Sequence, residues 1–431
     1  MKSRLLFVVA FCVGLVTSTP SHAADLAGGW SGTWTKDNDA LPVTVTFAKD
    51  GGGYSGSFDS DALQVAGIPL SSVTEAGGNI HFELKGDQST AVFDGKASTD
   101  QMAGEFTDGP SKGRFELSRA PMSSAAIRIR EVTFVDKEVT LAGSLLAPAS
   151  SGKAAAIIFL QGSGPEGRWA NRYLAQKFAE HGIVALIFDK RGVGGSTGDW
   201  RRVGFEALAD DAAAGIRFLQ TQSEVDPGRI GIYGHSQGGT IVPLVAIKAK
   251  SVAFIIASAA GGLTPAEVET FSVENSIGVK TLPTAEQAEA RAFVRAIVDV
   301  AYRGKNYASL GAVAQRFKDR SWYFDPPPAD SSYWALSKQI AGYRPERYWR
   351  QVTAPVLLIY GLRDERVPPR ASADAVVAAL KRGGNGKVTV KTYPDADHTL
   401  TIVNPPRTGG WPKHEPDYAA TLTGWAARRL E

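Results

Sequence analysis

Two patterns of apolar and polar positions divide the chain. Up to about residue 120, short runs of alternating apolar and polar residues are separated by glycine-rich turns, roughly 8–12 residues apart, as in antiparallel all-β units. The runs are 41–47, 54–58, 80–84, 91–93 and 113–117, with Trp30 and Trp34 in a preceding first strand. We expect a small barrel or sandwich over residues 24–120, in which packing of the tryptophans is favoured over ligand stacking.

From residue 127 continuous apolar strands alternate with amphipathic helices. A hairpin over 127–135 and 138–146 precedes strands at 156–160, 183–188, 230–233, 253–258, 355–360 and 387–392, and helices near 169–180, 205–220, 239–250, 371–382 and 414–429. Strands that are apolar on both faces indicate a mostly parallel sheet covered by helices on both sides. The small residues of 121–126 form the expected linker, so the second domain spans 127–431.

The alternation is interrupted between about residues 262 and 353 by an insertion with helical patterns such as 285–302. We expect a helical lid over the carboxyl ends of the strands. Its aromatic residues are Trp322, Tyr323, Phe324, Tyr333, Trp334, Tyr343, Tyr348 and Trp349. These rings either line an acyl or aromatic pocket or form the core of the lid itself, and core packing is the expectation for most of them.

The beginning of the chain has the pattern of an export signal. Lys2 and Arg4 precede an apolar run over 5–16, which is too short to cross a bilayer, and small residues precede a cleavage point after Ala23. We expect a signal peptide over 1–23, with a retained anchor as the alternative, and a periplasmic or secreted mature chain without an integral membrane segment. Cys12, the single cysteine, would leave with it, which excludes disulfides and thiol catalysis.

The amino-acid composition bears on whether the chain binds nucleic acid or membranes. Of the 431 residues, 43% are hydrophobic and 21% are charged, and the formal net charge is +3, as in an ordinary globular protein. This balance gives no electrostatic argument for binding nucleic acid or an anionic membrane.

A candidate nucleophile stands at the turn between strand 230–233 and helix 239–250. Gly234-His235-Ser236-Gln237-Gly238 fits the G-x-S-x-G pattern, in which a serine is lifted off a strand end directly before a helix. The strained turn needs neighbours without side chains, which the two glycines supply. We predict that the Ser236 hydroxyl projects above the sheet and that His235 is a wall of the turn rather than a catalyst.

The same pattern occurs again at Gly194-Gly195-Ser196-Thr197-Gly198. A polar linker over 189–193 separates it from the preceding apolar run, and no helix begins directly after it. We therefore interpret Ser196 as part of a glycine-rich loop and favour Ser236. The loop also lacks a Walker lysine–serine pair and a complete G-x-G-x-x-G, which argues against nucleotide binding.

A serine hydroxyl becomes a strong nucleophile when a base takes its proton and an acid holds that base in the right tautomer. His398, in a loop after the last predicted strand, is the candidate base, and Asp364, also just past a strand end, is the candidate acid. Ser236, Asp364 and His398 follow one another in the order expected of this architecture. The other histidines are placed elsewhere. His22 lies in the leader, His81 is interpreted as structural, His181 as a cap at a helix end, and His414 lies near the start of the last expected helix.

An acyl oxyanion needs two backbone N–H donors that are already in place. The N–H of Gln237, directly after the candidate nucleophile, is one candidate. The second is expected in the glycine-rich loop 161–165, where the Ser163 N–H is preferred. A plain strand-to-helix turn is the alternative for this loop.

From about residue 127 the chain resembles the α/β-hydrolase superfamily. FLQGSGPEGR, IFDKRGVGGSTGDW, RIGIYGHSQGG and LLIYGLRDERVPP are similar to segments of secreted bacterial esterases of the serine aminopeptidase and dienelactone-hydrolase branches, several of which carry an N-terminal β domain. The resemblance implies an α/β-hydrolase fold with a lid. It also implies a small-molecule ester substrate with a short-chain or aromatic acyl group, and no metal or organic cofactor. Gln161 stands where many relatives have histidine.

Other functions remain open on the same residues. A serine peptidase or aminopeptidase would need an anchor for a peptide terminus, for which the lid offers Glu267, Glu269 and Glu274. A thioesterase acting on coenzyme A thioesters fits export poorly, because that cofactor is intracellular. A catalytically degenerate protein that binds the cell envelope through its β domain is a further alternative, and the sequence gives no signal for an oligomeric state.

Overall fold

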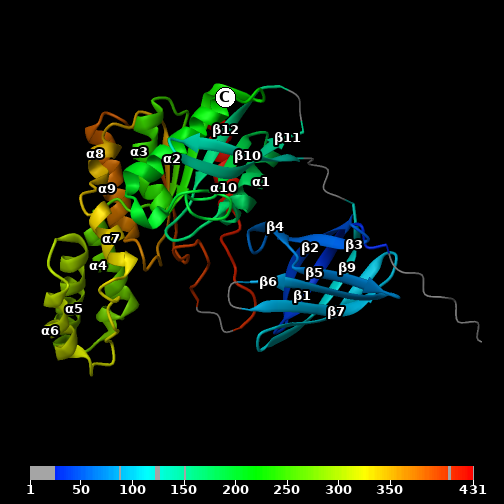
Figure 1. The fold of residues 1–431 in the computed structure, drawn as a ribbon, viewed down its shortest axis with the longest axis horizontal. Coiled ribbons are helices and arrows are strands. Elements are labelled where there is room, and N and C mark those ends of the chain that lie inside the picture. Colours follow the sequence, from blue (N-terminus) through cyan, green and yellow to red (C-terminus); the bar gives the residue numbers. More distant parts are fainter. Residues whose placement is uncertain (1–24, 87–88, 122–126, 150–151, 406–408, 431) are drawn as a thin grey trace, which may run out of the picture.

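The computed structural model describes residues 25–86, 89–121, 127–149, 152–405 and 409–430. They form an N-terminal β domain and a larger α/β domain, which lie side by side with the lid helices on the side away from the β domain (Figure 1). The expected signal peptide and nearly all of the expected linker fall outside the described residues.

The β domain is one antiparallel sheet that curves into a half-barrel, in the order β4-β3-β2-β1-β9-β8-β7-β6-β5. Its strands are β1 (Gly28–Lys36), β2 (Asp39–Asp50), β3 (Gly53–Ser60), β4 (Val65–Pro69), β5 (Ser72–Ala76), β6 (Asn79–Lys85), β7 (Thr90–Ala97), β8 (Gln101–Asp108) and β9 (Ser111–Ala120). Every second residue points inward, and Trp30 and Trp34 are buried in an aromatic core, as expected.

Three strands of the half-barrel escape the sequence pattern. β4 and β5 are short, and they lie at the two ends of the strand order, where burial is weakest. In β8 the alternation is broken at Gly104, where a Cβ would clash with the backbone of Asp94 and Gly95 on the neighbouring strand β7. The pattern therefore underestimates the strands while assigning the all-β class correctly.

The second sheet has eight strands in the order β10-β11-β13-β12-β14-β15-β16-β17, parallel from β13 to β17. The strands are β10 (Ile127–Asp136), β11 (Val139–Pro148), β12 (Ala154–Leu160), β13 (Val184–Phe188), β14 (Val225–His235), β15 (Ile255–Ser258), β16 (Val356–Gly361) and β17 (Val388–Tyr393). The hairpin of β10 and β11 adds the antiparallel edge. This is the mostly parallel sheet that the sequence predicts.

Helices cover both faces of this sheet. α2 (Phe205–Gln220), α3 (Gln237–Ala249), α8 (Pro345–Trp349) and α9 (Pro369–Arg382) pack on one face, and α1 (Arg172–Glu180) and α10 (Tyr418–Leu430) pack on the other. The prediction that the last helix begins at residue 414 is wrong, because 414 pairs with Thr401 in an extended segment. Among the described residues, no helix is both long and apolar enough to cross a membrane.

The lid consists of α4 (Pro265–Ser276), α5 (Thr284–Tyr302), α6 (Ala308–Phe317) and α7 (Ser332–Ile340), followed by α8. Its aromatic residues pack inward, as expected for most of them. Trp322, Trp334 and their aromatic neighbours form a core of the lid, and Tyr343 and Trp349 join the main core of the α/β domain.

One long segment between β17 and α10 connects the two domains (Figure 1, orange-red). The Trp411 ring lies 6.4 Å from Trp34 and 5.9 Å from Phe106 at the rim of the half-barrel. Its indole Nε1–H donates to the Asp39 carbonyl at 3.1 Å, and Lys413 forms an ion pair with the Asp39 carboxylate. Trp411 therefore fixes this segment to the β domain.

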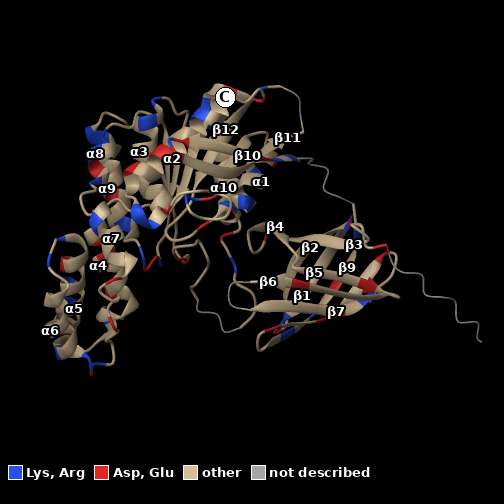
Figure 2. Ribbon diagram, in the orientation of Figure 1, with Lys and Arg blue, Asp and Glu red and all other residues tan. Residues whose placement is uncertain are grey.

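Charged side chains of both signs occur in both domains (Figure 2). Lys177 on α1, for example, bridges to Asp61 of the β domain at 2.9 Å. Asp61 is exposed, and such a solvent-screened pair contributes about 0–1 kcal/mol, so Trp411 is the stronger of these two interdomain contacts.

We expect Trp411→Ala to destabilise the β domain. Truncating a fully buried tryptophan costs roughly 3–5 kcal/mol, and since Trp411 is half-buried we expect a free energy of unfolding lower by roughly 2 kcal/mol. Guanidinium unfolding followed by far-UV circular dichroism measures it. Trp169→Ala is the matched control, because Trp169 is 49% exposed. Equal losses in both variants would show that Trp411 makes no anchoring contact.

Candidate active site

Ser236 stands between the last residue of β14 and the first residue of α3, with φ 54° and ψ −115°. A non-glycine residue held there costs roughly 1–3 kcal/mol and persists only when its surroundings enforce it. They do so by contact, because a Cβ on Gly234 would lie 2.4 Å from the carbonyl carbon of Gly238. The predicted strained turn and the need for both glycines are confirmed.

Ser236, His398 and Asp364 form one hydrogen-bonded chain. The Ser236 Oγ lies 2.9 Å from His398 Nε2, and His398 Nδ1 lies 2.7 Å from Asp364 Oδ2. The second carboxylate oxygen of Asp364 accepts the backbone N–H groups of Arg366 and Val367, and Asp364 is buried. The backbone thus orients the carboxylate, the carboxylate orients the imidazole, and the imidazole faces the hydroxyl.

The other serine and histidine residues considered in the sequence form structural contacts away from the Ser236–His398–Asp364 chain. The Ser196 hydroxyl donates to the Asp189 carbonyl at 2.7 Å and accepts the Ala142 N–H at 2.9 Å. His181 caps the end of α1, and His81 lies beside Asp94 in the β domain. Glu365, next to Asp364 in the chain, is exposed.

The candidate oxyanion loop leaves the sheet beside the serine. β12 and β14 are parallel neighbours with Leu160 paired to Gly234, so loop 161–165 and the Ser236 turn emerge at the same edge. A Cβ on Gly238 would lie 2.7 Å from the Leu160 carbonyl oxygen, so the loop and the start of α3 are in contact. Ser163 and Gln237 are thereby held near Ser236, and their role as donors stays a prediction.

Residues 189–193 are not the polar linker that the sequence suggests. Asp189, Lys190 and Arg191 are all buried behind the candidate oxyanion loop. Asp189 accepts the N–H groups of Arg168 and Gly195, and Arg191 forms two 2.7 Å bonds with the Asp211 carboxylate. Three consecutive charged residues directly after a buried strand, at the active edge of the sheet, are the signal that could have located them.

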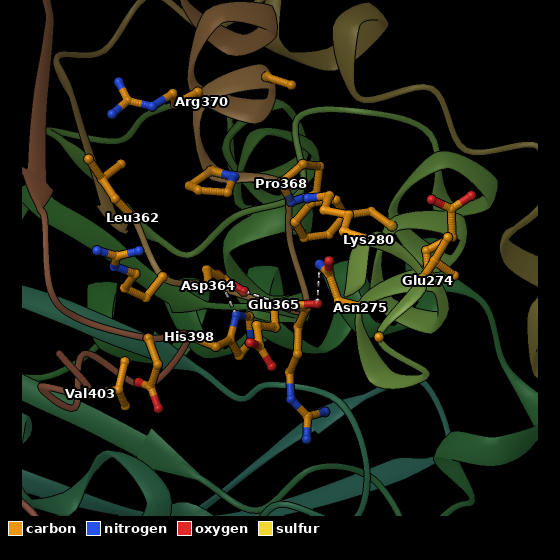
Figure 3. Close-up of a pocket in the computed structure, with 18 of the residues that line it drawn as sticks. Glu274, Asn275, Lys280, Leu362, Asp364, Glu365, Pro368, Arg370, His398 and Val403 are labelled. Atoms are coloured by element: carbon orange, nitrogen blue, oxygen red, sulfur yellow. Dashed lines mark hydrogen bonds and ion pairs between the residues drawn. The ribbon is translucent and has the colours of Figure 1, made fainter. Parts of the chain in front are cut away.

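A groove of about 1100 Å³ opens beside His398. Figure 3 shows His398 and Asp364 at one side, with Glu274, Asn275 and Lys280 from the lid across from them. None of the eight aromatic lid residues singled out in the sequence lines this groove, where Phe271 supplies the aromatic surface. The groove is lined by polar and apolar groups in similar measure. Its lid wall is joined to the acid loop by the Asn275 amide, which donates to the Glu365 carbonyl at 3.1 Å.

His235 is held neutral beside the candidate base. Its ring lies 5.0 Å from the His398 ring. Burial, assisted by the charge of His398, lowers the pKa of His235 to about 3. His235 therefore cannot compete for the serine proton near neutral pH, which agrees with its predicted role as a wall of the turn.

Comparison with known proteins gives one broad match and several partial ones. The family model for the serine aminopeptidases, S33, matches residues 152–402. An esterase of Thermotoga maritima is 22% identical over 282 residues, which are 62% of this chain and 60% of that protein. An uncharacterised protein of Mycobacterium tuberculosis is 29% identical over 144 residues, 33% of this chain and 50% of that protein.

The chain spans about half the length of the curated relatives it matches. Among solved structures, an esterase of Pyrococcus furiosus aligns with a TM-score of 0.46 at 18% identity, over 71% of this chain and 92% of that chain.

We predict that His235 weakens the fold in acid. An unfolded histidine has a pKa near 6.5, so between this value and about 3 the unfolded chain binds more protons, and the free energy of unfolding falls as pH drops. At about pH 5 the penalty is roughly 1–2 kcal/mol. His235→Phe should remove it, as measured by urea unfolding at about pH 7 and pH 5.

His181→Asn is the control, because His181 is exposed at the end of α1 and this variant should keep the acid sensitivity of the parent. An unchanged pH dependence in His235→Phe would contradict the assignment.

Proposed function

We propose, from the premise that the chain belongs to the serine aminopeptidase S33 family of α/β hydrolases, that it cleaves carboxylic esters through an acyl-enzyme on Ser236. The observation that carries the proposal is the hydrogen-bonded chain from Ser236 through His398 to Asp364. It joins a strained serine to a base whose other nitrogen is held by a buried carboxylate, the arrangement that activates a serine hydroxyl.

The proposed reaction has two halves. His398 Nε2 takes the proton of Ser236 as Oγ attacks the ester carbonyl, and Asp364 stabilises the imidazolium through Nδ1–H. The tetrahedral oxyanion is stabilised by the N–H groups of Ser163 and Gln237. His398 then gives its proton to the leaving alcohol, and in the second half it activates the water that releases the acid.

The groove beside His398 is the place that we propose for the leaving group. It begins at His398, which gives its proton to the alcohol oxygen, so we place the alcohol side of the substrate in the groove. Its charged lining residues, such as Glu274 and Lys280, support an alcohol with hydrogen-bonding groups. The name of the Thermotoga relative, an esterase, supports ester over amide substrates.

Ser236→Ala should abolish covalent labelling by a fluorescent fluorophosphonate and lower kcat for p-nitrophenyl butyrate by at least ~10⁴-fold, because the nucleophile is removed. Ser196→Ala is the matched control, since Ser196 lies in the second G-x-S-x-G and its hydroxyl bonds only to backbone groups among the described residues. Labelling that survives in a folded Ser236→Ala variant would disprove the proposed nucleophile.

An aminopeptidase activity is the second candidate, favoured by the position of one lid carboxylate. Glu274 lines the groove across from His398, whereas Glu267 caps the start of α4 and Glu269 is half-buried against the Tyr333 hydroxyl. A carboxylate in the groove could hold the ammonium group of a peptide. Glu274 already lies 3.7 Å from Arg291, however, which weakens it as an anchor.

Comparing p-nitrophenyl esters with aminoacyl p-nitroanilides separates the two candidates. We expect ester turnover to dominate, with KM for esters changed less than about threefold in Glu274→Gln, because a neutral ester makes no ion pair with this carboxylate. Glu267→Gln, which alters a carboxylate outside the groove, is the control. Dominant anilide cleavage, with KM raised in Glu274→Gln alone, would instead establish the aminopeptidase.

A further inference from the structure

Lys190 is a buried lysine without a carboxylate partner. It follows β13 directly, its exposed fraction is 3%, and among the described residues it forms no ion pair with an acidic side chain. Buried ammonium groups are rare and are normally paired, because removing the charge from water is costly. The groups that replace water around Lys190 therefore matter to its role.

One hydrogen bond of Lys190 goes to a peptide proposed to bind the oxyanion, and the other two go to groups next to the proposed donors. Its Nζ donates to the carbonyl of Gly162, to the carbonyl of Gly164 at 2.8 Å and to the side-chain oxygen of Gln237 at 3.4 Å. The Gly162 carbonyl and the Ser163 N–H belong to one planar peptide group, in which C=O and N–H point in opposite directions. An ammonium group bonded to that C=O therefore lies behind the Ser163 N–H.

We propose that Lys190 is a positioning residue of the oxyanion hole, which fixes the Gly162–Ser163 peptide with its N–H toward the substrate and strengthens that N–H as a donor. The inference rests on the proposed function. Two further contacts hold the same loop: the Glu166 carboxylate accepts the Gly162 N–H at 2.6 Å, and the Gln161 side chain donates to the Phe188 carbonyl. Lys190 supplies the one positive charge within this frame.

The charge acts on the transition state more than on the bound ester. A charge-assisted bond to the carbonyl polarises the peptide, and hydrogen bonds in a chain strengthen one another in a low-dielectric interior. The oxyanion becomes fully negative only as the tetrahedral intermediate forms, so donors already in place lower the barrier of that step. Loss of Lys190 should therefore lower kcat and leave KM nearly unchanged.

The charge state of Lys190 gives a second readout. Burial lowers the pKa of Lys190 from 10.5 to about 8, and the Glu166 carboxylate opposes this shift. The other groups that face it are the Trp200 ring at 5.6 Å and, across a small cavity, Asp211, which is bonded to Arg191. Lys190 should lose its proton, and kcat should fall, as pH rises through about 8.

This alkaline loss is distinguishable from unfolding. The folded chain releases the Lys190 proton near pH 8, whereas an unfolded lysine keeps it up to about 10.5, so between these values the unfolded chain binds more protons. The contribution of Lys190 to the free energy of unfolding therefore rises with pH in this range. A fall in activity without a fall in stability is the expected signature.

The test is Lys190→Met, which keeps an unbranched side chain and removes the charge. With p-nitrophenyl butyrate from about pH 6 to 10, we expect kcat near neutral pH to fall roughly 10²-fold, KM to change less than about threefold, and the alkaline decline of the parent to be absent. Lys248→Met is the matched control, because Lys248 on α3 is partly buried but paired with Glu206 and Asp210. It should keep the kcat and the pH profile of the parent.

Lys190→Arg covers the case in which Lys190→Met does not fold. Arginine keeps its charge throughout the range, so its kcat should no longer decline above pH 8. An unchanged kcat in Lys190→Met, or an alkaline decline that persists in either variant, overturns the inference. If the unmodified protein neither reacts with fluorophosphonate nor turns over the ester, the proposed function itself is disproved. If the unmodified protein reacts and Lys190→Met has the same kcat, only the inference is disproved.

Discussion

The contact between β14 and α3 is the constraint on which the rest of the site depends. Gly234 and Gly238 touch at a distance that no side chain would allow, and Ser236 is held between them in a conformation that it would not adopt alone. The absence of a side chain on Gly238 also lets the carbonyls of residues 160 and 161 lie against it. The candidate nucleophile and the candidate oxyanion loop therefore have one geometric origin, the glycines at the edge of the parallel sheet.

The triad candidates could be located from sequence because each one follows a buried strand. β14 leads to Ser236, β16 to Asp364 and β17 to His398, and the carboxyl ends of parallel strands meet at one edge of the sheet. Apolar periodicity identifies such strands, and chain order supplies the rest. The hydrogen bonds that orient Asp364, by contrast, come from the backbone of 366–367, for which no side-chain pattern exists.

The sequence fails where burial contradicts polarity. Asp189, Lys190 and Arg191 have charged side chains, so the sequence suggests a solvent-exposed linker. They are buried nevertheless, because burial depends on how the strands and loops assemble and not on residue type alone. Their partners, Arg168, Asp211 and the carbonyls of the oxyanion loop, lie about 20–30 positions away in the chain. The aromatic lid shows the opposite case, since core packing is expected for most of its rings and they do pack against each other, away from the groove.

The position of His398 depends on contacts with both domains. The segment after it turns back at Leu400, whose φ is 62°, and residues 400–402 then pair with 413–415, where the Ile402 N–H donates to the Lys413 carbonyl at 2.7 Å. Two residues before Lys413, Trp411 is docked on the rim of the half-barrel. The histidine loop is thus tied to the α/β sheet at one end and to the β domain at the other. A β domain that served only as a separate binding module would not need to hold this loop, so its contact with Trp411 makes it part of the scaffold of the site.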